Sequence, residues 1–459
     1  MRKTFLSTLL AASLMAGSTA VYAAPPASVE QAQHGQGQSQ KAFDQQIVKK
    51  TDAEAMYRTI ETLAKTPRVA GSPEELQSVR YIEKQFKSFG YQVEVQPFQF
   101  DGYKAPSSVS LHIGNQATEA HVFTYSPNGN VTAELVDVGL GTEADVAGKD
   151  LKGKIALIQR GTLTFGDKVR NAAKQGAKAV VIYNNAEGKL DGTLGGADAS
   201  FVAAVGITKA DGEALAKRLK AGETVTATVN VAGSEVKKLT SHNVIATKKP
   251  DANKKNTKDI IIIGSHHDSV EGAPGANDDA SGVAVTLELA RVLSKLKTDT
   301  ELRFVTFGAE ENGLIGSEKY AATLTPDEIK RTVAMFQMDM VGSRDAGDLI
   351  MYTIDGEKNR VTDLGAAASS RLTGVLPYSQ EGRSDHESFH ALGIPAALFI
   401  HAPVEPWYHS PDDTLDKISK EKLKNVADIV GSAIYQVSRP GDVYIEKVDY
   451  PKKEVELQN

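Results

Sequence analysis

Between Asn243 and residue 440, short apolar runs alternate with segments of helical periodicity, and this alternation constrains the fold more than any other feature. Runs with strand character lie at 244–247, 260–264, 302–307, 333–338 and 396–400, and helical patterns lie at 280–295, 313–322, 359–372 and 420–437. The run 260–264 is apolar throughout, as expected for a strand covered on both faces. The alternation predicts an α/β fold with a mostly parallel or mixed sheet and helices on both faces. Ligands of such sheets bind beyond the carboxyl ends of the strands.

Residues with metal-ligand chemistry follow these predicted strands. They are His266, Asp278, Glu311, Asp339 and His409. Taken singly, each has an ordinary explanation, such as a helix cap or a charged first turn. Together they are expected to converge on one crevice, and imidazole with carboxylate suits Zn²⁺ or another first-row divalent ion. Two ions that share a bridging carboxylate would account for the number and types of these residues.

At two places, adjacent residues compete for the role of ligand: His266 with His267, and Glu310 with Glu311. His266 and Asp268 face the same side of an extended segment, whereas His267 points away. His266 is therefore the better ligand, with Asp268 orienting its ring from the other nitrogen. Of Glu310 and Glu311, one can ligate while the other takes a proton from water at the metal.

The rest of the chain divides into further segments. Residues 1–23 combine a basic start, a short apolar run and small residues before a cleavage site, which predicts a signal peptide and export. Residues 24–48, rich in Gln, Ala, Ser and Gly, are expected to be a linker or a removable pro-segment. The β-rich stretch 117–233 predicts a domain inserted into a catalytic domain made of 49–116 and 234–440. Residues 441–459 form a charged tail.

Composition excludes several classes of protein. The chain has no cysteine, so a metal can be held only by His, Asp and Glu. Its net charge of −6 argues against nucleic acid or an anionic membrane as a partner.

Several motifs resemble the dinuclear zinc aminopeptidases of the bacterial leucine-aminopeptidase type. These are His266-x-Asp268, Gly275-Ala276-Asn277-Asp278-Asp279-x-Ser281-Gly282, Gly308-Ala309-Glu310-Glu311-x-Gly313-Leu314-x-Gly316-Ser317, Met338-Asp339-Met340-x-Gly342 and Tyr408-His409-x-x-x-Asp413. Ser384-Asp385-His386-x-x-Phe389 is similar to a family segment near the substrate pocket.

The resemblance implies a zinc-exopeptidase-like fold and a role for each motif residue. It makes Asp278 the bridging ligand, and assigns His266 and Asp339 to one zinc and Glu311 and His409 to the other. It also makes Glu310 the general base, Asp268 the residue that orients the ligand His266, and Tyr408 a donor to the developing oxyanion.

The insert resembles a protease-associated domain. The similar residues are the run Leu151–Gly161, then Phe165-x-Asp167-Lys168-Val169, then Ala172-x-x-x-Gly176-Ala177. Together the two resemblances point to the secreted Bacillus-type aminopeptidases that carry such an insert. In that family the insert is usually described as limiting or guiding substrate access, and a simple spacer is an equally good explanation.

These resemblances imply a secreted aminopeptidase with two Zn²⁺ per chain, for which Co²⁺ or Mn²⁺ can substitute. Its substrates would be peptides with a free amino end, with a broad preference that includes Leu and extends to basic residues, and the protein is expected to be a monomer. A carboxypeptidase on the same fold is the nearest alternative, with Arg383 as its candidate carboxylate-binding residue. A single-zinc glutaminyl cyclase and a binding protein with a degenerate site are further alternatives. No Gly-x-Ser-x-Gly elbow supports a serine hydrolase.

Overall fold

Four parallel strands form the centre of the main sheet, in the order β12 (Glu301–Phe307), β11 (Ile260–His266), β13 (Thr332–Met338) and β16 (Ala396–Ala402). Alternate residues of β11 pack on opposite faces of this sheet. Ile261 and Ile263 join one hydrophobic cluster, whereas Ile260 and Ile262 join another. This explains why the run 260–264 is apolar at every position, and the predicted α/β fold class is confirmed.

Further strands complete the sheet at both edges. On one side β10 (Glu235–Lys248) pairs antiparallel with β12, and β1 (Gln92–Lys104) pairs antiparallel with β10. On the other side β14 (Asp348–Thr353) pairs antiparallel with β16, and β15 (Tyr378–Gln380) pairs parallel with β14. The sheet is therefore mixed, with four parallel strands at its centre.

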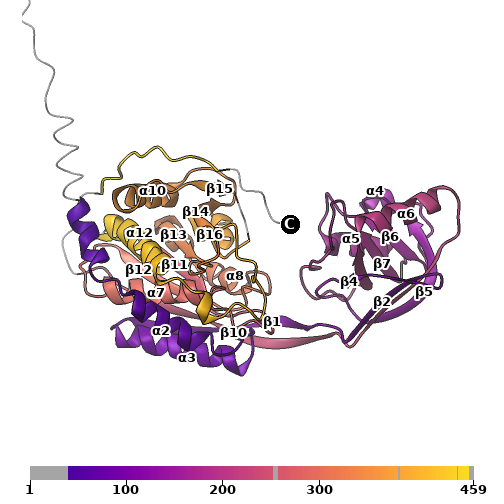
Figure 1. The fold of residues 1–459 in the computed structure, drawn as a ribbon, viewed down its shortest axis with the longest axis horizontal. Coiled ribbons are helices and arrows are strands. Elements are labelled where there is room, and N and C mark those ends of the chain that lie inside the picture. Colours follow the sequence, from indigo (N-terminus) through magenta and orange to yellow (C-terminus); the bar gives the residue numbers. More distant parts are fainter. Residues whose placement is uncertain (1–39, 252–256, 381–382, 442, 454–459) are drawn as a thin grey trace, which may run out of the picture.

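Helices cover both faces of this sheet (Figure 1). One face is covered by α2 (Ala53–Leu63), α3 (Pro73–Ser88), α7 (Ala280–Leu293), α10 (Arg360–Leu372) and α12 (Lys420–Ser438). The other face is covered by α8 (Ile315–Ala321), α9 (Pro326–Arg331) and α11 (His386–His390). The helices thus cover the faces of the sheet, and loops surround the carboxyl ends of the parallel strands.

The insert has a sheet of its own. Its strand order is β3 (Gln116–Thr118), β2 (Ser108–Ile113), β9 (Thr226–Ala232), β5 (Gly129–Asp137), β6 (Ile155–Gln159), β7 (Ala179–Tyr183), β8 (Ala203–Ile207) and β4 (His121–Val122). Its helices are α4 (Glu143–Val146), α5 (Phe165–Lys174) and α6 (Lys209–Lys220). Because β2 pairs with β9, the insert begins before residue 108, and the predicted start at 117 is too late.

A two-stranded ribbon carries the chain into the insert and back. β1 leaves the main sheet and β10 returns to it, and the two strands remain paired as far as Lys104 opposite Glu235 (Figure 1). The Tyr125 hydroxyl donates a hydrogen bond to the Asp101 backbone oxygen at 2.8 Å, which ties the insert to the ribbon.

The computed structural model describes residues 40–251, 257–380, 383–441 and 443–453. The predicted signal peptide and residues 24–39 of the predicted linker lie outside this part of the chain. Residues 40–48, by contrast, are helical rather than a linker. Ile47 is fully buried in the main core, and the buried Asp44 carboxylate pairs with Arg371 of α10 at 2.6 Å. Composition alone did not reveal this packing.

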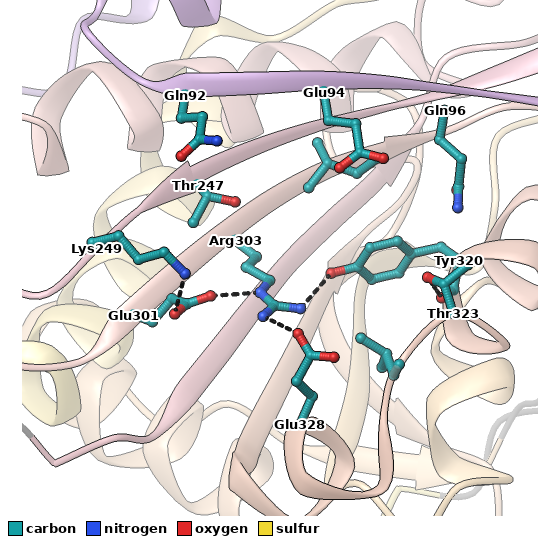
Figure 2. Close-up of a pocket in the computed structure, with 12 residues that line it drawn as sticks. Gln92, Glu94, Gln96, Thr247, Lys249, Glu301, Arg303, Tyr320, Thr323 and Glu328 are labelled. Atoms are coloured by element: carbon teal, nitrogen blue, oxygen red, sulfur yellow. Dashed lines mark hydrogen bonds and ion pairs between the residues drawn. The ribbon is translucent and has the colours of Figure 1, made fainter.

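A cavity of about 380 Å³ lies against β1, β10 and β12 (Figure 2). Three of its charged groups form a linked set, since Arg303 contacts Glu301 at 2.8 Å and Glu328 at 2.5 Å. It lies near the start of β12 and so at the opposite end of the sheet from the strand ends described below. Among the described residues, no helix has both the length and the hydropathy needed to cross a membrane.

Candidate metal centre

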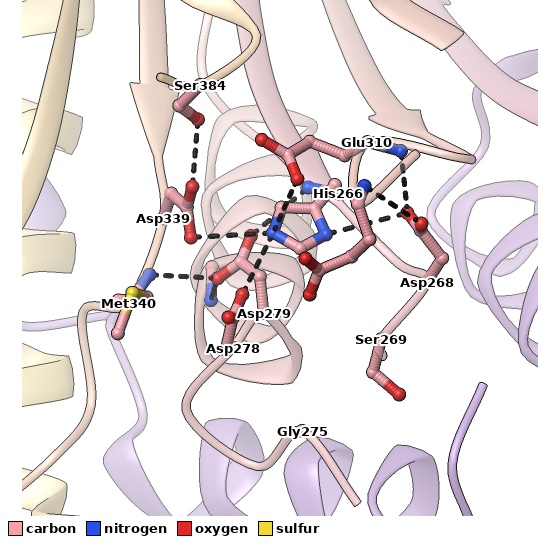
Figure 3. Close-up of polar contacts among 12 residues, drawn as sticks. His266, Asp268, Ser269, Gly275, Asp278, Asp279, Glu310, Asp339, Met340 and Ser384 are labelled. Carbon is pink, nitrogen blue, oxygen red and sulfur yellow. Dashed lines mark hydrogen bonds and ion pairs between the residues drawn. The ribbon is translucent and has the colours of Figure 1, made fainter. Parts of the chain in front are cut away.

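The loops after the parallel strands bring the predicted ligands together at one edge of the sheet. His266 is the last residue of β11, and Asp339 directly follows β13. Asp278 lies in the loop before α7. The Nε2 atom of His266 lies 3.1 Å from Asp278 Oδ1 and 3.5 Å from Asp339 Oδ1, so these three side chains form one cluster (Figure 3).

A second cluster shares Asp278 with the first. The Nε2 atom of His409 lies 3.2 Å from Asp278 Oδ2 and 2.9 Å from Glu311 Oε2. The two carboxylate oxygens of Asp278 therefore face two different imidazoles. This is the arrangement expected of a carboxylate that bridges two cations.

The spacing and chemistry of both clusters fit zinc. Ligand atoms about 2.0–2.2 Å from a tetrahedral Zn²⁺ lie roughly 3.3–3.6 Å from one another, close to the separations seen here. Asp339 Oδ1 and Glu311 Oε1 are buried and have no hydrogen-bond partner among the described residues. Acceptors left unpaired in this way are suited to a cation.

The pKa values of two candidate ligands also indicate an excess of negative charge in the second cluster. Burial and the nearby Asp278 carboxylate raise the pKa of Glu311 to about 7. Desolvation lowers the pKa of His409, but its hydrogen bonds to Asp278 and Glu311 outweigh this and raise it to about 10. A bound cation would relieve the repulsion between carboxylates and displace the proton from the imidazole.

Asp268 connects three parts of the site. Its Oδ1 atom lies 3.5 Å from His266 Nδ1 and accepts the backbone N–H of Glu310 at 3.1 Å (Figure 3). Its Oδ2 atom accepts the backbone N–H of Glu311 at 3.2 Å. Asp268 thus lies where it can orient both the His266 ring and the segment after β12.

Glu310 lies beside the first cluster without joining it. Its Oε2 atom is 4.0 Å from His266 Nε2, and the side chain is largely buried. Burial raises the pKa of Glu310 well above its ordinary value, and Asp385 and Glu311 add to this while His266 opposes it. The Glu310 carboxyl group therefore lies beside the first cluster and is not one of its members.

Tyr408 contacts the second cluster through its ring. The ring stacks on that of His409 with 3.8 Å between centroids, and 45% of the residue is exposed. Although nearly half of the residue is exposed, desolvation and the carboxylates Asp278 and Glu311 raise the pKa of Tyr408 above its ordinary value. The hydroxyl therefore stays protonated at neutral pH and can donate a hydrogen bond.

Two residues that had no predicted site role hold the ligand loop in place. Asp279 caps α7 through the N–H of Gly282 at 2.7 Å, and also accepts the N–H of His266 at 3.1 Å and that of Met340 at 3.2 Å. Asp413 accepts the N–H of Asn277 at 2.8 Å and that of Asp278 at 3.0 Å. Their place inside the quoted motifs was the only signal in the sequence that could have found them.

Three non-glycine residues at the site have a left-handed backbone. Ala309 precedes Glu310 and has φ 54°, Met340 follows Asp339 and has φ 56°, and the candidate ligand His409 has φ 55°. Such conformations are costly for residues other than glycine and concentrate at functional sites. Here they turn the chain sharply where the side chains must point inward.

A cavity of about 730 Å³ opens beside Glu310 and Glu311. The catalytic unit lines it with Leu314, Glu318, Arg383 and Glu387, and the insert lines it with Tyr125, Thr193 and residues 195–197. Part of the predicted pocket segment near residue 384 therefore reaches the cavity, which lies between the two units.

The chain is similar to families and proteins that are already known. The model of peptidase family M28 matches residues 243–434, and that of the PA domain matches residues 131–215. Aminopeptidase YwaD of Bacillus subtilis (strain 168) is 40% identical over 400 residues, which are 84% of each chain. The solved aminopeptidase from Aneurinibacillus sp. strain AM-1 is 80% identical over 90% of this chain and 100% of its own, with a TM-score of 0.88. The structure of BSAP, a zinc aminopeptidase from Bacillus subtilis, is 38% identical over 85% of this chain and 96% of its own, with a TM-score of 0.65.

Proposed function

Because this chain belongs to peptidase family M28 and is a zinc aminopeptidase, we propose that it removes amino-terminal residues from peptides at a centre of two zinc ions. In this proposal His266 and Asp339 would hold one ion, Glu311 and His409 would hold the other, and Asp278 would be shared between them. The observation that carries the proposal is the sharing of Asp278 between the two clusters, with one oxygen directed at each imidazole.

Two zinc ions held by these residues would supply Lewis acidity to the scissile carbonyl and to the attacking water. Glu310 acts as the general base. It accepts a proton from the attacking water and delivers it to the nitrogen of the leaving group. Its burial and its position beside the first cluster support this role, because a raised pKa suits a carboxylate that must both take and return a proton.

Tyr408 and Asp268 support this reaction in different ways. The Tyr408 hydroxyl donates to the oxyanion that develops on the scissile carbonyl, a contribution worth about 3–4 kcal/mol for a well-placed donor. Stacking on His409 supports this role because it fixes the ring beside the centre. Asp268 fixes the orientation of His266 and the path of the chain at Glu310.

The finer features of the proposal concern substrate and location. The substrates are peptides with a free amino end, with a broad preference that includes Leu and extends to basic residues. The cavity beside Glu310 supports a side-chain pocket of mixed character, since it is lined by Leu314 together with Glu318 and Glu387. The protein is secreted as a monomer, Zn²⁺ is the native metal, and Co²⁺ or Mn²⁺ can replace it.

Metal content measured together with end-group specificity tests the proposal. The purified protein should contain two zinc ions per chain, lose activity on thorough chelation and recover it when zinc is returned. It should cleave Leu-p-nitroanilide and leave the N-acetylated analogue intact. One zinc ion per chain at full activity, or cleavage of the blocked substrate, would refute the dinuclear aminopeptidase mechanism.

A further inference from the structure

Arg68 lies directly beneath the loop that joins the candidate ligands His266 and Asp278. It is one of the largest fully buried side chains of the described chain, with 1% of the residue exposed. It follows α2 in sequence, about two hundred positions before the loop that it contacts. Since an arginine side chain stays charged in a protein, a cation is enclosed next to the metal centre.

The guanidinium binds backbone carbonyls. Its Nε atom donates to His267 O at 2.7 Å, Nη1 to Pro274 O at 2.5 Å and to Leu63 O at 3.2 Å, and Nη2 to Gly275 O at 3.0 Å. Three of these carbonyls belong to the loop between the two ligands. Among the described residues Arg68 forms no ion pair, although a buried charge usually has a carboxylate partner.

The backbone of Arg68 is joined to the same loop. Its N–H donates to Ser269 Oγ at 2.9 Å, and its carbonyl accepts the N–H of Ser269 at 3.3 Å. Ser269 Oγ donates in turn to Ala273 O at 3.0 Å. Figure 3 shows Ser269 and Gly275 on the stretch of chain that leads from Asp268 to Asp278. Both ends of this loop are therefore fixed to one residue of another segment.

The charge of Arg68 is balanced by the site as a whole. Burial lowers the pKa of the guanidinium, and Asp413, Asp268, Asp279 and Asp278 oppose this effect. These are the carboxylates that ligate, orient or hold the proposed centre. A planar guanidinium with five donors can bind several carbonyls at once, which an ammonium of three donors cannot do in the same geometry.

We propose that Arg68 is a positioning residue of the metal centre, which fixes the loop between His266 and Asp278 and stabilises the negative charge of the ligand set. The inference rests on the proposed dinuclear function. It assigns Arg68 an effect on zinc affinity that is separate from its effect on folding.

The test compares zinc affinity in variants of two buried arginines. Arg68→Met removes the charge and the donors, and Arg68→Lys retains the charge only. Arg371→Met is the control, because the Arg371 side chain is also largely buried, with 4% exposed, but pairs with Asp44 and Glu446 near the helix 40–48. Zinc affinity is measured by chelator competition, zinc content by elemental analysis, and folding by thermal unfolding with and without zinc.

Arg68→Met should bind zinc at least tenfold more weakly, as is typical when a residue that supports metal ligands is lost, and Arg68→Lys should lie between it and the wild type. Arg371→Met should lower the unfolding temperature and leave zinc affinity unchanged. Wild-type zinc affinity in Arg68→Met, or in Arg68→Lys if the methionine variant does not fold, would overturn the role of Arg68. A wild-type protein with fewer than two zinc ions would instead overturn the proposed function.

Discussion

Asp268 and Glu310 are joined by a hydrogen bond of 3.1 Å from the Glu310 backbone N–H to the Asp268 carboxylate. The same oxygen lies 3.5 Å from the Nδ1 atom of His266. One carboxylate therefore sets the relative position of a candidate ligand on β11 and the candidate base after β12. Because the two strands are adjacent and parallel, a short side chain can span them.

Asp268→Asn should disturb this link without removing a proposed ligand. Asparagine offers one acceptor oxygen in place of two, so its NH₂ group must face either a ring nitrogen or a backbone N–H. We expect kcat and zinc affinity to fall by about 10–100-fold. Steady-state kinetics and chelator competition measure both quantities. The exposed Asp150→Asn is the control, and equal behaviour of the two variants would contradict the prediction.

Glu310→Gln should separate catalysis from metal binding. The amide keeps the shape of the side chain but cannot accept a proton, so kcat should fall by at least about 10²–10⁴-fold. Elemental analysis should still find the zinc content of the wild type. Glu271→Gln, at an exposed position of the nearby loop, should retain full activity. Loss of zinc from Glu310→Gln would reassign this residue as a ligand.

Zinc affinity should rise with pH. In the metal-free protein the pKa of His409 is about 10 and that of Glu311 is about 7, so zinc must displace protons at neutral pH. Each displaced proton makes affinity rise about tenfold per pH unit below the pKa of the group concerned. Competition with a chelator of known pH dependence between pH 6 and 8 checks this, and a flat profile would show that the ligands are already deprotonated.

Asp44→Ala should destabilise the protein without affecting zinc content. It leaves the Arg371 guanidinium buried with Glu446 as its remaining acidic partner, so the free energy of unfolding should fall by about 3–5 kcal/mol. Denaturant titration measures this change. Glu83→Ala breaks the exposed Lys87 pair and should cost less than about 1 kcal/mol. A similar small effect at Asp44 would mean that helix 40–48 contributes little to stability.

The same helix limits where a pro-segment can end. Ile47 is fully buried, and the Phe43 ring packs edge-on against Tyr435 at 6.3 Å. If the chain is processed after export, we expect the mature amino end to lie before residue 40. Amino-terminal sequencing of the secreted protein checks this, and a mature protein that begins at residue 49 would contradict it.

The local pattern of the sequence was sufficient to predict the strands of the central sheet. Strand–helix alternation correctly predicted β11, β12, β13 and β16, because strands buried on both faces need long apolar runs. The resemblance to zinc aminopeptidases and the inserted domain is confirmed by the matched families and relatives. The carboxypeptidase alternative receives no support from these relatives, which are named aminopeptidases.

Features that depend on distant partners were not predictable in this way. The helix 40–48 is polar in composition, and its buried Asp44 pairs with Arg371, which lies 327 positions away. β2 has the same mixed pattern as its surroundings, and only its pairing with β9 assigns it to the insert. In the sequence Arg68 cannot be distinguished from a surface arginine, because its burial depends on contacts with carbonyls of the loop 267–275. The five candidate ligands could be identified from the sequence because they lie at the ends of predictable strands or in the loops that follow them.

The ribbon of β1 and β10 has a consequence for the history of the chain. The crossings into and out of the insert lie on neighbouring strands, so the catalytic sheet would need only a tight hairpin near Gly102 if the insert were absent. A domain whose two ends lie about 5 Å apart can occupy this position without disturbing the sheet that receives it. The architecture is therefore modular: a different domain with adjoining termini could be grafted there to change what reaches the zinc centre, while the catalytic machinery is inherited intact.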